Sequence, residues 1–572
     1  MEKILIANRG EIAVRIIRAC KDYGVKSVAV YADSDADSLF VRMADEAYAL
    51  PGTKPAETYL NSEAILNIAA RAGADALHPG YGFLSERAAF ARAVQQAGLT
   101  WIGPDAEVID ALGDKVSARR IALQAGAPLV PGSNGPVANA AEAVAFARQH
   151  GLPMAIKAVY GGGGRGLKVA RRLEDVPDYY ESAVREAVVA FGRGDCFVER
   201  FLDHPRHLEA QIIADKHGNI VVLGTRDCSL QRRNQKLVEE APAPFITESQ
   251  RALIEDSAKR ICAISGYSSA GTVEFLLGKD GTISFLEVNT RLQVEHPVTE
   301  ETTGIDLVIE QFRVAEGKPL SLTTPPQPCR HAFEFRINAE DPAQGFLPTP
   351  GQITRFVPPA GPGVRLDSGV LSGSIVCGQY DSLIAKLIVT GKNREEALRR
   401  ARRALAEFTI EGLATTLPFH QAVLAHPDFT GEDGFQIHTG WIETDFKSVL
   451  ISSPRSQQPE EPALLRLPVE IDGKRHQLGL PRALLAGLRA APQAEMLQTT
   501  LVAVGAVQAP VAGTIQSWKI RDKTEVQEGD LLAVMEAMKM EVQVVAPRKG
   551  IIEPQAALGA FVKAGEPIAL YL

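Results

Sequence analysis

The sequence of 572 residues has few cysteines, no long apolar run and no excess of basic residues. No two cysteines form a CxxC pair, and six in so long a chain are too sparse for a disulfide scaffold. We therefore expect a reducing compartment. No run of about 18 apolar residues occurs, so we expect no membrane-spanning helix and no membrane partner. The cysteines are Cys20, Cys196, Cys228, Cys262, Cys329 and Cys377.

The formal net charge of -8 argues against nucleic acid as a partner. Hydrophobic residues make up 45% of the chain and charged residues 23%, which is the balance of a soluble globular protein. Residues 3–7 begin a strand at once and leave no room for a signal or transit peptide. We expect a cytoplasmic protein of roughly three to five domains.

The N-terminal residues predict a βαβ unit, with a strand over 3–7, a helix over 11–23 and a strand over 27–31. The turn Asn8-Arg9-Gly10-Glu11 lies where parallel α/β sheets often bind ligands. It holds only one glycine, so we do not infer a dinucleotide. A second turn, residues 78–86, follows a predicted strand and fits a rigid turn as well as a ligand site.

A glycine run over residues 161–166 follows the predicted strand 153–158. By itself the run fits a mobile hairpin better than a binding site. Lys115 and Lys157 change this balance, because they offer point charges for phosphate oxygens that a glycine-rich turn can cover with backbone N–H groups. Residues 196–202 read as a strand leading to a hinge that could hold an adenine.

Two polar stretches follow. The strand 206–214 places His207, Glu209 and Gln211 on one face, which either faces solvent or lines a site. Residues 227–236 are rich in cations and amides. They fit a solvated loop or an anion site, and the lack of an acidic partner before Glu239 favours the anion site.

Glu274 and the run Glu287-Val288-Asn289 lie on two predicted antiparallel strands joined by a turn at 278–281. Their oxygens can converge, and Mg²⁺ prefers carboxylates combined with nucleotide phosphates. Arg291 and Glu295 come directly afterwards and suit an anionic substrate and a base. Arg336 adds one more cation.

The C-terminal residues contain an internal repeat, in which the pattern of 509–515 returns over 546–552. Such a repeat predicts a small pseudo-symmetric β domain. Strands on both sides of Met538-Lys539 place this pair at the tip of a two-residue hairpin, with the lysine projecting into solvent. An ordinary surface lysine is the alternative, but a methionine on each side is unusual for solubility alone.

Two further segments are predicted between these regions. Residues 394–408 form an amphipathic helix whose solvated face carries i,i+4 ion pairs. Residues 446–505 have the composition of a linker and contain a hairpin over 467–480 that turns at Asp472-Gly473. An isolated hairpin is marginal in water, so we expect it to gain stability by docking on another subunit.

The chain from residue 1 to about 445 resembles a biotin carboxylase of the ATP-grasp superfamily. The resemblance rests on five ordered motifs: HPGYGFLSE, GGGGRG, DCSLQRRNQK, EVNTRLQVEH and RINAED. EAMKM resembles the biotinyl attachment motif, whereas lipoyl domains usually lack the paired methionines. Two residues depart from the family pattern. Tyr160 stands where many relatives continue the glycine run, which puts the flexibility of the lid in doubt. Asn234 stands where many relatives have histidine, which puts one nucleotide contact in doubt.

The resemblance implies an α/β ATP-grasp fold with an N-terminal Rossmann-like domain, a mobile lid, a linker and a C-terminal all-β biotinyl/lipoyl-type barrel. The implied domains are 1–114 (N-terminal α/β), 115–329 (ATP-grasp, with its lid over 130–203), 330–445 (C-terminal domain of the carboxylase), 446–505 (linker with hairpin) and 506–572 (carrier).

The resemblance also implies site roles. The catalytic residues would be Lys236, Arg291, Glu295 and Arg336. Bicarbonate and biotin would contact Tyr81, Lys236, Arg291, Gln293, Val294 and Arg336. ATP would contact Lys115, Lys157, Gly161, Gly162, Gly163, Gly164, Gly166, Glu199, Arg200, Leu202, His207, Gln231 and Asn234. Mg²⁺ or Mn²⁺ would be held by Glu274, Glu287 and Asn289, and biotin by Lys539.

The expected reaction starts with removal of the bicarbonate proton by Glu295. Carbonate then attacks the γ-phosphate of ATP to give carboxyphosphate, which releases CO₂ and phosphate. The phosphate deprotonates the ureido nitrogen of biotin, and Arg336 stabilises the enolate oxygen. Catalysis of this kind is mostly positioning and charge stabilisation.

We expect a separate carboxyltransferase β subunit that carboxylates an acyl-CoA, with acetyl-CoA or propionyl-CoA first. The remaining residues after 445 are too few for a transferase plus a carrier. A biotin protein ligase and a homo-oligomer within a hetero-oligomeric carboxylase are further expected partners. Pyruvate, methylcrotonyl-CoA and urea carboxylases remain alternatives, as do a scaffold with an inactive ATP-grasp domain and a ligase with a lipoyl-type carrier.

Overall fold

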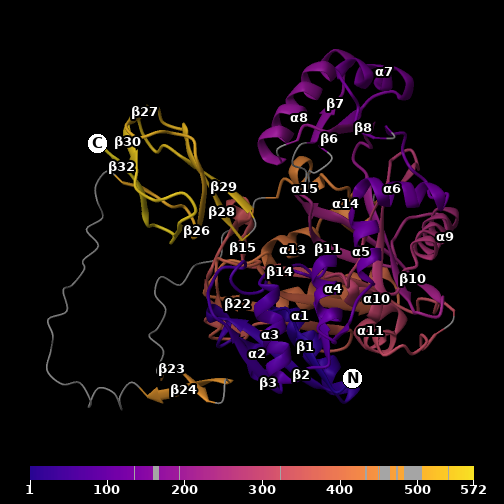
Figure 1. The fold of residues 1–572 in the computed structure, drawn as a ribbon. Helices are drawn as coiled ribbons and strands as arrows, with labels where there is room; N and C mark the ends of the chain where they lie inside the picture. Colours follow the sequence, from indigo (N-terminus) through magenta and orange to yellow (C-terminus); the bar gives the residue numbers. More distant parts are fainter. Residues whose placement is uncertain are drawn as a thin grey trace.

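Figure 1 shows the arrangement of the chain in a computed structural model. A large α/β body carries a small helix-and-strand subdomain on top and a β barrel at one side. The structure describes residues 1–133, 135–158, 167–191, 193–322, 324–431, 434–448, 450, 464–471, 474–481, 506–538 and 540–572. No helix within these ranges is long and apolar enough to cross a membrane.

The N-terminal unit is a parallel sheet in the order β3-β2-β1-β4-β5, covered by helices. The expected βαβ start is confirmed. In α1 the side chains of Ile12, Ile16 and Ile17 are buried, and Gly24 ends the helix in the left-handed conformation. The elements are β1 Lys3–Ile6, α1 Gly10–Tyr23, β2 Lys26–Ala32, η1 Asp33–Asp35, α2 Leu39–Met43, β3 Glu46–Leu50, α3 Ser62–Ala72, β4 Ala76–His78, α4 Ala88–Gln96, β5 Thr100–Trp101 and α5 Ala106–Gly113.

The subdomain on top of the body, called the lid below, has a three-stranded antiparallel sheet in the order β7-β6-β8 and two helices. Its apolar core is separate from that of the body. The predicted strands at 153–158 and 196–202 are confirmed. The lid elements are α7 Ala140–His150, β6 Met154–Ala158, β7 Leu167–Ala170, η2 Leu173–Asp175, α8 Val176–Phe191 and β8 Cys196–Arg200.

The centre of the body is an eight-stranded antiparallel sheet in the order β13-β12-β9-β10-β11-β14-β21-β19. Its strands are β9 Arg206–Ala214, β10 Ile220–Arg232, β11 Gln235–Ala241, β12 Ser269–Leu277, β13 Ile283–Asn289, β14 His331–Asn338, β19 Val364–Ser368 and β21 Leu383–Gly391. The polar segment 227–236 forms the end of β10, a two-residue turn and the start of β11. Its side chains are thereby brought to the middle of the sheet.

Helices and short strands complete the body. The predicted helix at 394–408 is α12, and its pairs Arg399–Glu395 and Arg400–Glu396 are formed. The helices are α6 Lys115–Gln124, α9 Glu248–Ser265, α10 His296–Thr303, α11 Leu307–Ala315, η3 Pro342–Gln344, α12 Arg394–Glu407, α13 Leu417–Val423, α14 Pro427–Thr430 and α15 Trp441–Thr444. The short strands are β15 Glu340–Asp341, β16 Leu347–Pro348, β17 Gly351–Gln352, β18 Arg355–Val357, β20 Ile375–Val376 and β22 Thr409–Glu411.

The linker hairpin is also present, as β23 Leu464–Ile471 paired with β24 Lys474–Pro481. In Figure 1 it lies beside β3, the edge strand of the N-terminal sheet. The alanine-rich stretch that follows it lies outside the described residues.

The C-terminal barrel has two four-stranded sheets, β25-β32-β30-β27 and β29-β28-β26-β31. Replacing each strand of the first sheet by its counterpart in the repeat gives the order of the second sheet, so the predicted pseudo-symmetry is confirmed. The strands are β25 Ala506–Gln508, β26 Gly513–Trp518, β27 Thr524–Val526, β28 Leu531–Ala537, β29 Met540–Val545, β30 Gly550–Pro554, β31 Phe561–Val562 and β32 Pro567–Tyr571.

Candidate functional site

A cavity of about 840 Å³ lies where the N-terminal sheet, the lid and the eight-stranded sheet meet. Every site residue predicted from the sequence that the structure describes lines this cavity. They are Tyr81, Lys115, Lys157, Glu199, Arg200, Leu202, His207, Gln231, Asn234, Lys236, Glu274, Glu287, Asn289, Arg291, Gln293, Val294, Glu295 and Arg336. Residues 161–166 and Lys539 lie outside the described residues.

The register of three strands assembles the acidic centre of the cavity. Glu274 on β12 is opposite Glu209 on β9 and opposite Glu287 on β13. The carboxylates therefore converge from adjacent strands, as the sequence predicts for Glu274 and Glu287. All three side chains belong to the same sheet, so their positions are fixed by backbone hydrogen bonds.

Lys236, at the start of β11, lies among the carboxylates. Its Nζ is 2.7 Å from Glu295 Oε1 and 3.0 Å from Glu274 Oε1, and it also contacts Glu209. Burial disfavours the charge of the ammonium, but the three carboxylates outweigh this effect and hold the pKa of Lys236 well above its usual value. Lys236 thus stays a cation.

Glu295 is fully buried yet ionised. Burial alone would raise its pKa, but Lys236 and Arg336 favour the carboxylate, and the pKa lies below its usual value. Arg336 Nη2 donates to Glu295 Oε2 at 2.9 Å, and Arg336 Nε donates to Glu239 at 2.5 Å. Lys236 thus contacts one oxygen of the Glu295 carboxylate and Arg336 contacts the other. A carboxylate held ionised in this way can serve as the proton acceptor for a substrate in the cavity.

Glu287 differs from Glu274 and Glu295, because its pKa lies above its usual value and theirs lie below. Burial and the neighbouring Glu274 both raise its pKa. Asn289 Nδ2 donates to Glu274 Oε1 at 2.8 Å, so its amide lies beside the pair. Two close carboxylates and an amide oxygen form the donor set that suits Mg²⁺. The residues therefore fit the ion that the sequence predicts.

Arg291 is held by one residue outside the predicted set, Glu86, and by one inside it, Asn289. Its Nε donates to Glu86 Oε2 at 2.9 Å and its Nη2 to Asn289 Oδ1 at 3.0 Å. Glu86 ends the HPGYGFLSE turn, which explains how that turn contributes to the site. Tyr81 of the same turn donates a hydrogen bond to Glu11.

Lys115 and Lys157 define the lid side of the cavity. Lys115 is the first residue of α6, directly after the N-cap Asp114, which accepts a hydrogen bond from the Ser117 amide. Lys157 on β6 pairs with Glu199 on the adjacent β8. The glycine run is flanked by β6 and β7, which pair antiparallel, so it connects two neighbouring strands of the lid.

His207 and Asn234 contribute polar groups at the same end of β10. His207 Nε2 is 2.9 Å from Glu274 Oε2, and this carboxylate raises the pKa of His207 against the opposing effect of burial. Asn234 forms the turn between β10 and β11 together with Arg233, and both have positive φ. Asparagine tolerates this conformation better than most residues.

Several residues of the site were missed by the sequence reasoning. Arg226 is fully buried and donates to Glu209 at 2.8 Å, and Glu239 holds Arg336. Burial raises the pKa of Glu239 to about 7. No two-residue alternation marks either residue in the sequence, because Arg226 is followed by the polar Asp227 and Glu239 is followed by Glu240.

The barrel reaches the cavity through its hairpin tip. Ala537 and Met540 are directly paired, which leaves positions 538 and 539 as the predicted two-residue loop. Met538 has a φ of 47° and lines the cavity, where it is 5% exposed and packs with the apolar core of the body. The residue before Lys539 thus contacts the body rather than solvent.

Comparisons with known proteins agree with this geometry. Residues 1–109 match the family described as biotin carboxylase, N-terminal domain, residues 114–323 the carbamoyl-phosphate synthase L chain, ATP binding domain, residues 334–444 the biotin carboxylase C-terminal domain, and residues 505–570 the biotin-requiring enzymes. The chain is 57% identical to the biotin-dependent acyl-coenzyme A carboxylase alpha3 subunit of Mycobacterium leprae, over 99% of this chain and 97% of that protein. The chain belongs to the biotin-dependent acyl-CoA carboxylase α subunits.

Solved structures support the same fold for the body. The biotin carboxylase of Campylobacter jejuni, in complex with a nucleotide, is 41% identical with a TM-score of 0.73, and it covers 77% of this chain and 98% of its own. A second structure is the biotin carboxylase domain of the Hydrogenobacter thermophilus 2-oxoglutarate carboxylase, in complex with MgADP and bicarbonate. It is 45% identical with a TM-score of 0.72, and it covers 77% of this chain and 97% of its own.

This α subunit is an ATP-dependent biotin carboxylase joined to a biotin carrier domain, with an ATP-grasp body and an all-β biotinyl/lipoyl-type barrel. Its cofactors and nucleotide are biotin, Mg²⁺ and ATP. Membership of the family implies bicarbonate as a substrate and a carboxyltransferase as a partner.

Proposed function

We propose that the cavity carboxylates a biotin attached to Lys539 and that a separate β subunit passes the carboxyl group to acetyl-CoA or propionyl-CoA. The observation that carries this proposal is Glu295, an ionised and fully buried carboxylate between Lys236 and Arg336 in a cavity that the carrier hairpin reaches.

Glu295 is the general base in this proposal. Its lowered pKa keeps it unprotonated at neutral pH, so an acceptor is available for the bicarbonate proton, although the lowered pKa does not itself favour the transfer. Lys236, Arg291 and Gln293 surround the same space and bind the anion, with Tyr81 and Val294 at its edge. A buried cluster of fixed cations costs no reorganisation when negative charge develops on the bicarbonate oxygens.

The nucleotide occupies the lid side. Lys115 and Lys157 neutralise the phosphates, together with the glycine run 161–166. The cavity wall formed by Leu202, Glu199, Arg200, His207, Gln231 and Asn234 takes the rest of the nucleotide. Glu274, Glu287 and Asn289 hold Mg²⁺, which when bound neutralises charge on the phosphoryl oxygens. Lys236 lies 3.0 Å from Glu274, so the anion site and the metal site share one carboxylate.

Arg336 orients the biotin ring. Its guanidinium is charged because Glu239 and Glu295 overcome the effect of burial. It lines the same cavity as Met538, the neighbour of the attachment lysine. Arg336 would donate hydrogen bonds to the carbonyl oxygen of the ureido ring, where they would favour negative charge.

We propose that the domain boundaries follow residues 1–114, 115–329 with a lid over 130–203, 330–445, 446–505 and 506–572. We also propose a biotin protein ligase as the modifying partner and a homo-oligomer within a hetero-oligomeric assembly. The name of the Mycobacterium leprae relative favours an acyl-CoA acceptor over pyruvate or urea.

The test is ATP cleavage with free biotin and bicarbonate. Glu295→Gln removes the base but keeps the shape, so the bicarbonate-dependent rate of ADP formation should fall about 100-fold or more. Asp110→Asn, at an exposed ion pair with Arg92 on the surface, serves as the matched control and should leave the rate unchanged. A normal rate in Glu295→Gln would remove Glu295 from the mechanism.

A further inference from the structure

The barrel touches the body at a second place, away from its hairpin tip. A Cβ placed on Gly378 of the body would lie 3.5 Å from the carbonyl oxygen of Ala512 and 3.8 Å from Phe561 Cζ of the barrel. Leu347 of the body packs against the apolar core of the barrel. The barrel is thus seated on the body by its side as well as by its tip.

The second contact is apolar and incompletely packed. The two surfaces enclose a cleft of about 370 Å³. The cleft is lined mainly by apolar residues, among them Leu347, Pro350 and Ile375 of the body and Pro510, Val511 and Ala564 of the barrel. Two glutamines and two threonines of the body also line it, and no charged side chain is among its described lining residues. A loosely packed apolar contact gains modest free energy from burial, so the barrel can dock and also leave.

We propose that the surface around this cleft, together with the contact between Gly378 of the body and Phe561 of the barrel, docks the carrier onto the body of its own chain; Phe561 is 36% exposed even in this position. The proposal rests on the proposed function and adds that carboxylation occurs in cis. Without the side contact, the contact of Met538 at the hairpin tip would have to hold the barrel at the cavity.

The experiment compares Gly378→Ala with Gly378→Gln in the full biotinylated chain. Gly378 does not have a positive φ, so either side chain fits its backbone. Alanine places its Cβ at ordinary contact distance, whereas glutamine enters the space that Phe561 occupies. We expect Gly378→Gln to slow transfer of labelled bicarbonate carbon to the chain's own biotin about tenfold, while Gly378→Ala and the free-biotin rate stay near wild type.

Phe561→Ser tests the barrel side, with Leu558→Ser as its control, because Leu558 is more exposed and lies nearby in the chain. Streptavidin capture checks that each barrel is folded and biotinylated. The wild-type rate constant should not depend on chain concentration. Equal rates in Gly378→Gln and Gly378→Ala, or a rate that rises with concentration, would overturn the proposal. Loss of free-biotin carboxylation in the wild type would instead overturn the proposed function.

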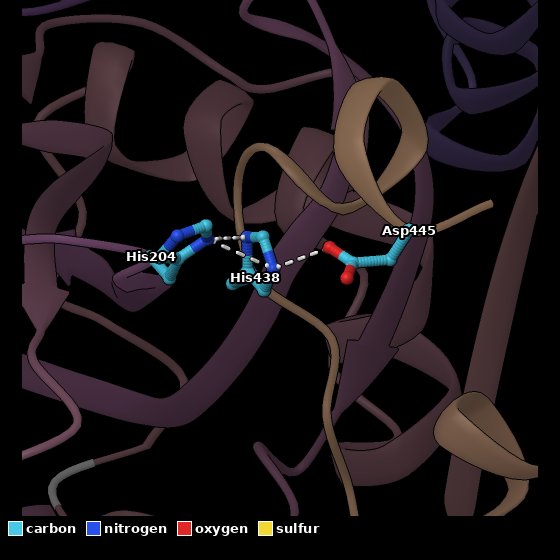
Figure 2. Close-up of side chains that lie close together, drawn as sticks. All are labelled: His204, His438 and Asp445. Carbon is cyan, nitrogen blue, oxygen red and sulfur yellow. Dashed lines mark hydrogen bonds and ion pairs between the residues drawn. The ribbon is translucent and has the colours of Figure 1, made fainter.

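A different observation concerns the base of the lid. Figure 2 shows His204, His438 and Asp445 in a row. His204 follows β8, the last lid strand, and His438 precedes α15 of the body. His204 Nδ1 lies 3.2 Å from Nδ1 and 3.1 Å from Nε2 of His438, with the rings 83° apart, and His438 Nε2 lies 3.0 Å from Asp445 Oδ2.

The hydrogen bonds fix the tautomer of His438. The Gly440 amide donates to His438 Nδ1 at 3.2 Å, so Nε2 carries the proton and donates to Asp445. Both ring nitrogens of His438 are therefore engaged in hydrogen bonds. Neither has a lone pair left for a metal ion, which argues against a metal site in this cluster. The nearly perpendicular His204 ring instead directs Nδ1 at the face of His438, as a weak N–H donor does.

The row joins the lid to the nucleotide end of the cavity. The Thr439 amide donates to the Pro205 carbonyl oxygen at 3.0 Å, and Leu202, Pro205 and Thr439 all line the cavity. We infer that His204 and His438 act as a clasp that positions the hinge of the lid, and thereby sets the affinity for ATP without taking part in the chemistry. This inference also rests on ATP as the ligand of the cavity.

The clasp is tested by a double-mutant cycle with His204→Ala and His438→Gln. Each variant should raise the KM for ATP about threefold to fivefold with kcat nearly unchanged, and the double variant should add little, because both remove one contact. His204→Asn, which keeps a side-chain N–H donor, should restore part of the loss.

Hydrogen exchange of the nucleotide-free chain provides a readout independent of catalysis, since the lid amides of β6 and β8 should exchange faster in His204→Ala. Additive effects, a fall in kcat alone or unchanged lid exchange would contradict the clasp. A KM for ATP that responds to added Zn²⁺ in the wild type and not in His204→Ala would show a metal site instead.

Discussion

At the scale of single residues, the site keeps buried side chains ionised by pairing each of them with groups of opposite charge. Glu295 and Lys236 stabilise each other, and Arg336 is shared between Glu295 and Glu239. A buried charge that loses one partner is strongly destabilised, because its desolvation is no longer offset. Substitutions in this group therefore affect both activity and folding, and each needs a stability measurement beside the kinetic one.

His420 offers a test of this buried electrostatics. Its Nε2 donates to the Arg336 carbonyl oxygen at 2.7 Å, and its Nδ1 is buried without a hydrogen-bond partner. Burial lowers its pKa to about 4. The unfolded chain takes up this proton near pH 6.5 and the folded chain only near 4, so the histidine costs stability as pH falls through that window.

His420→Gln cannot take up the proton. We expect the free energy of unfolding of wild type to fall by about 2 kcal/mol more than that of the variant between pH 7 and pH 5. Only the difference between wild type and variant is informative. Burial raises the pKa of Glu11 and Glu340 to about 7, so these two groups increase the free energy of unfolding as the pH falls, and they do so in both proteins. Denaturant titrations at the two pH values measure it, and parallel pH profiles would refute the assigned cause.

At the scale of elements, adjacent strands explain how residues far apart in sequence form one site. The sequence predicted β9, β12 and β13 of the large sheet, and it predicted that Glu274 and Glu287 converge because a short turn joins β12 to β13. It could not predict that Glu86 would meet Arg291, because this contact depends on how the N-terminal unit packs against the large sheet. Nor could it predict that Glu239 would meet Arg336, because this contact depends on the pairing of β11 with β14, two strands far apart in sequence.

The hairpin β23–β24 is the element whose role is open to a direct test. Its strands are present as predicted, and it lies beside β3 rather than within a larger sheet. A two-stranded hairpin gains stability from a docking partner. Deleting residues 464–482 should abolish co-purification with the carboxyltransferase and leave free-biotin carboxylation intact. Unchanged complex formation would show that another surface binds the transferase.

At the scale of the whole molecule, the carrier must serve two sites. Met538 lines the cavity of the body, whereas the transferase is a separate protein. A lysine side chain with its biotin spans only about 15 Å, so the barrel itself has to travel. The internal repeat predicted the pairing of its strands, but its seat against Gly378 depends on shape and could not be read from sequence.

The segment before the barrel sets the range of this travel. Residues 506–508 belong to β25, so the expected tether ends before them. A flexible chain as long as residues 490–505 would have a root-mean-square reach of roughly 22 Å. Shortening it by about ten residues should strongly reduce acyl-CoA carboxylation by the complete assembly, because delivery becomes geometrically restricted. ATP cleavage with free biotin should stay near wild type. Equal losses in both assays would show that the shortened chain is misfolded rather than restricted.

The most direct test of the account follows labelled carbon from bicarbonate onto the chain itself. The biotinylated chain, ATP, Mg²⁺ and labelled bicarbonate are mixed without transferase, and acid-labile label on the protein is counted. We expect close to one label per biotin, formed only with ATP, absent in Lys539→Arg, and formed at least 100-fold more slowly in Glu295→Gln. Label in Lys539→Arg, or ATP cleavage by the biotinylated chain without label, would contradict the central claim.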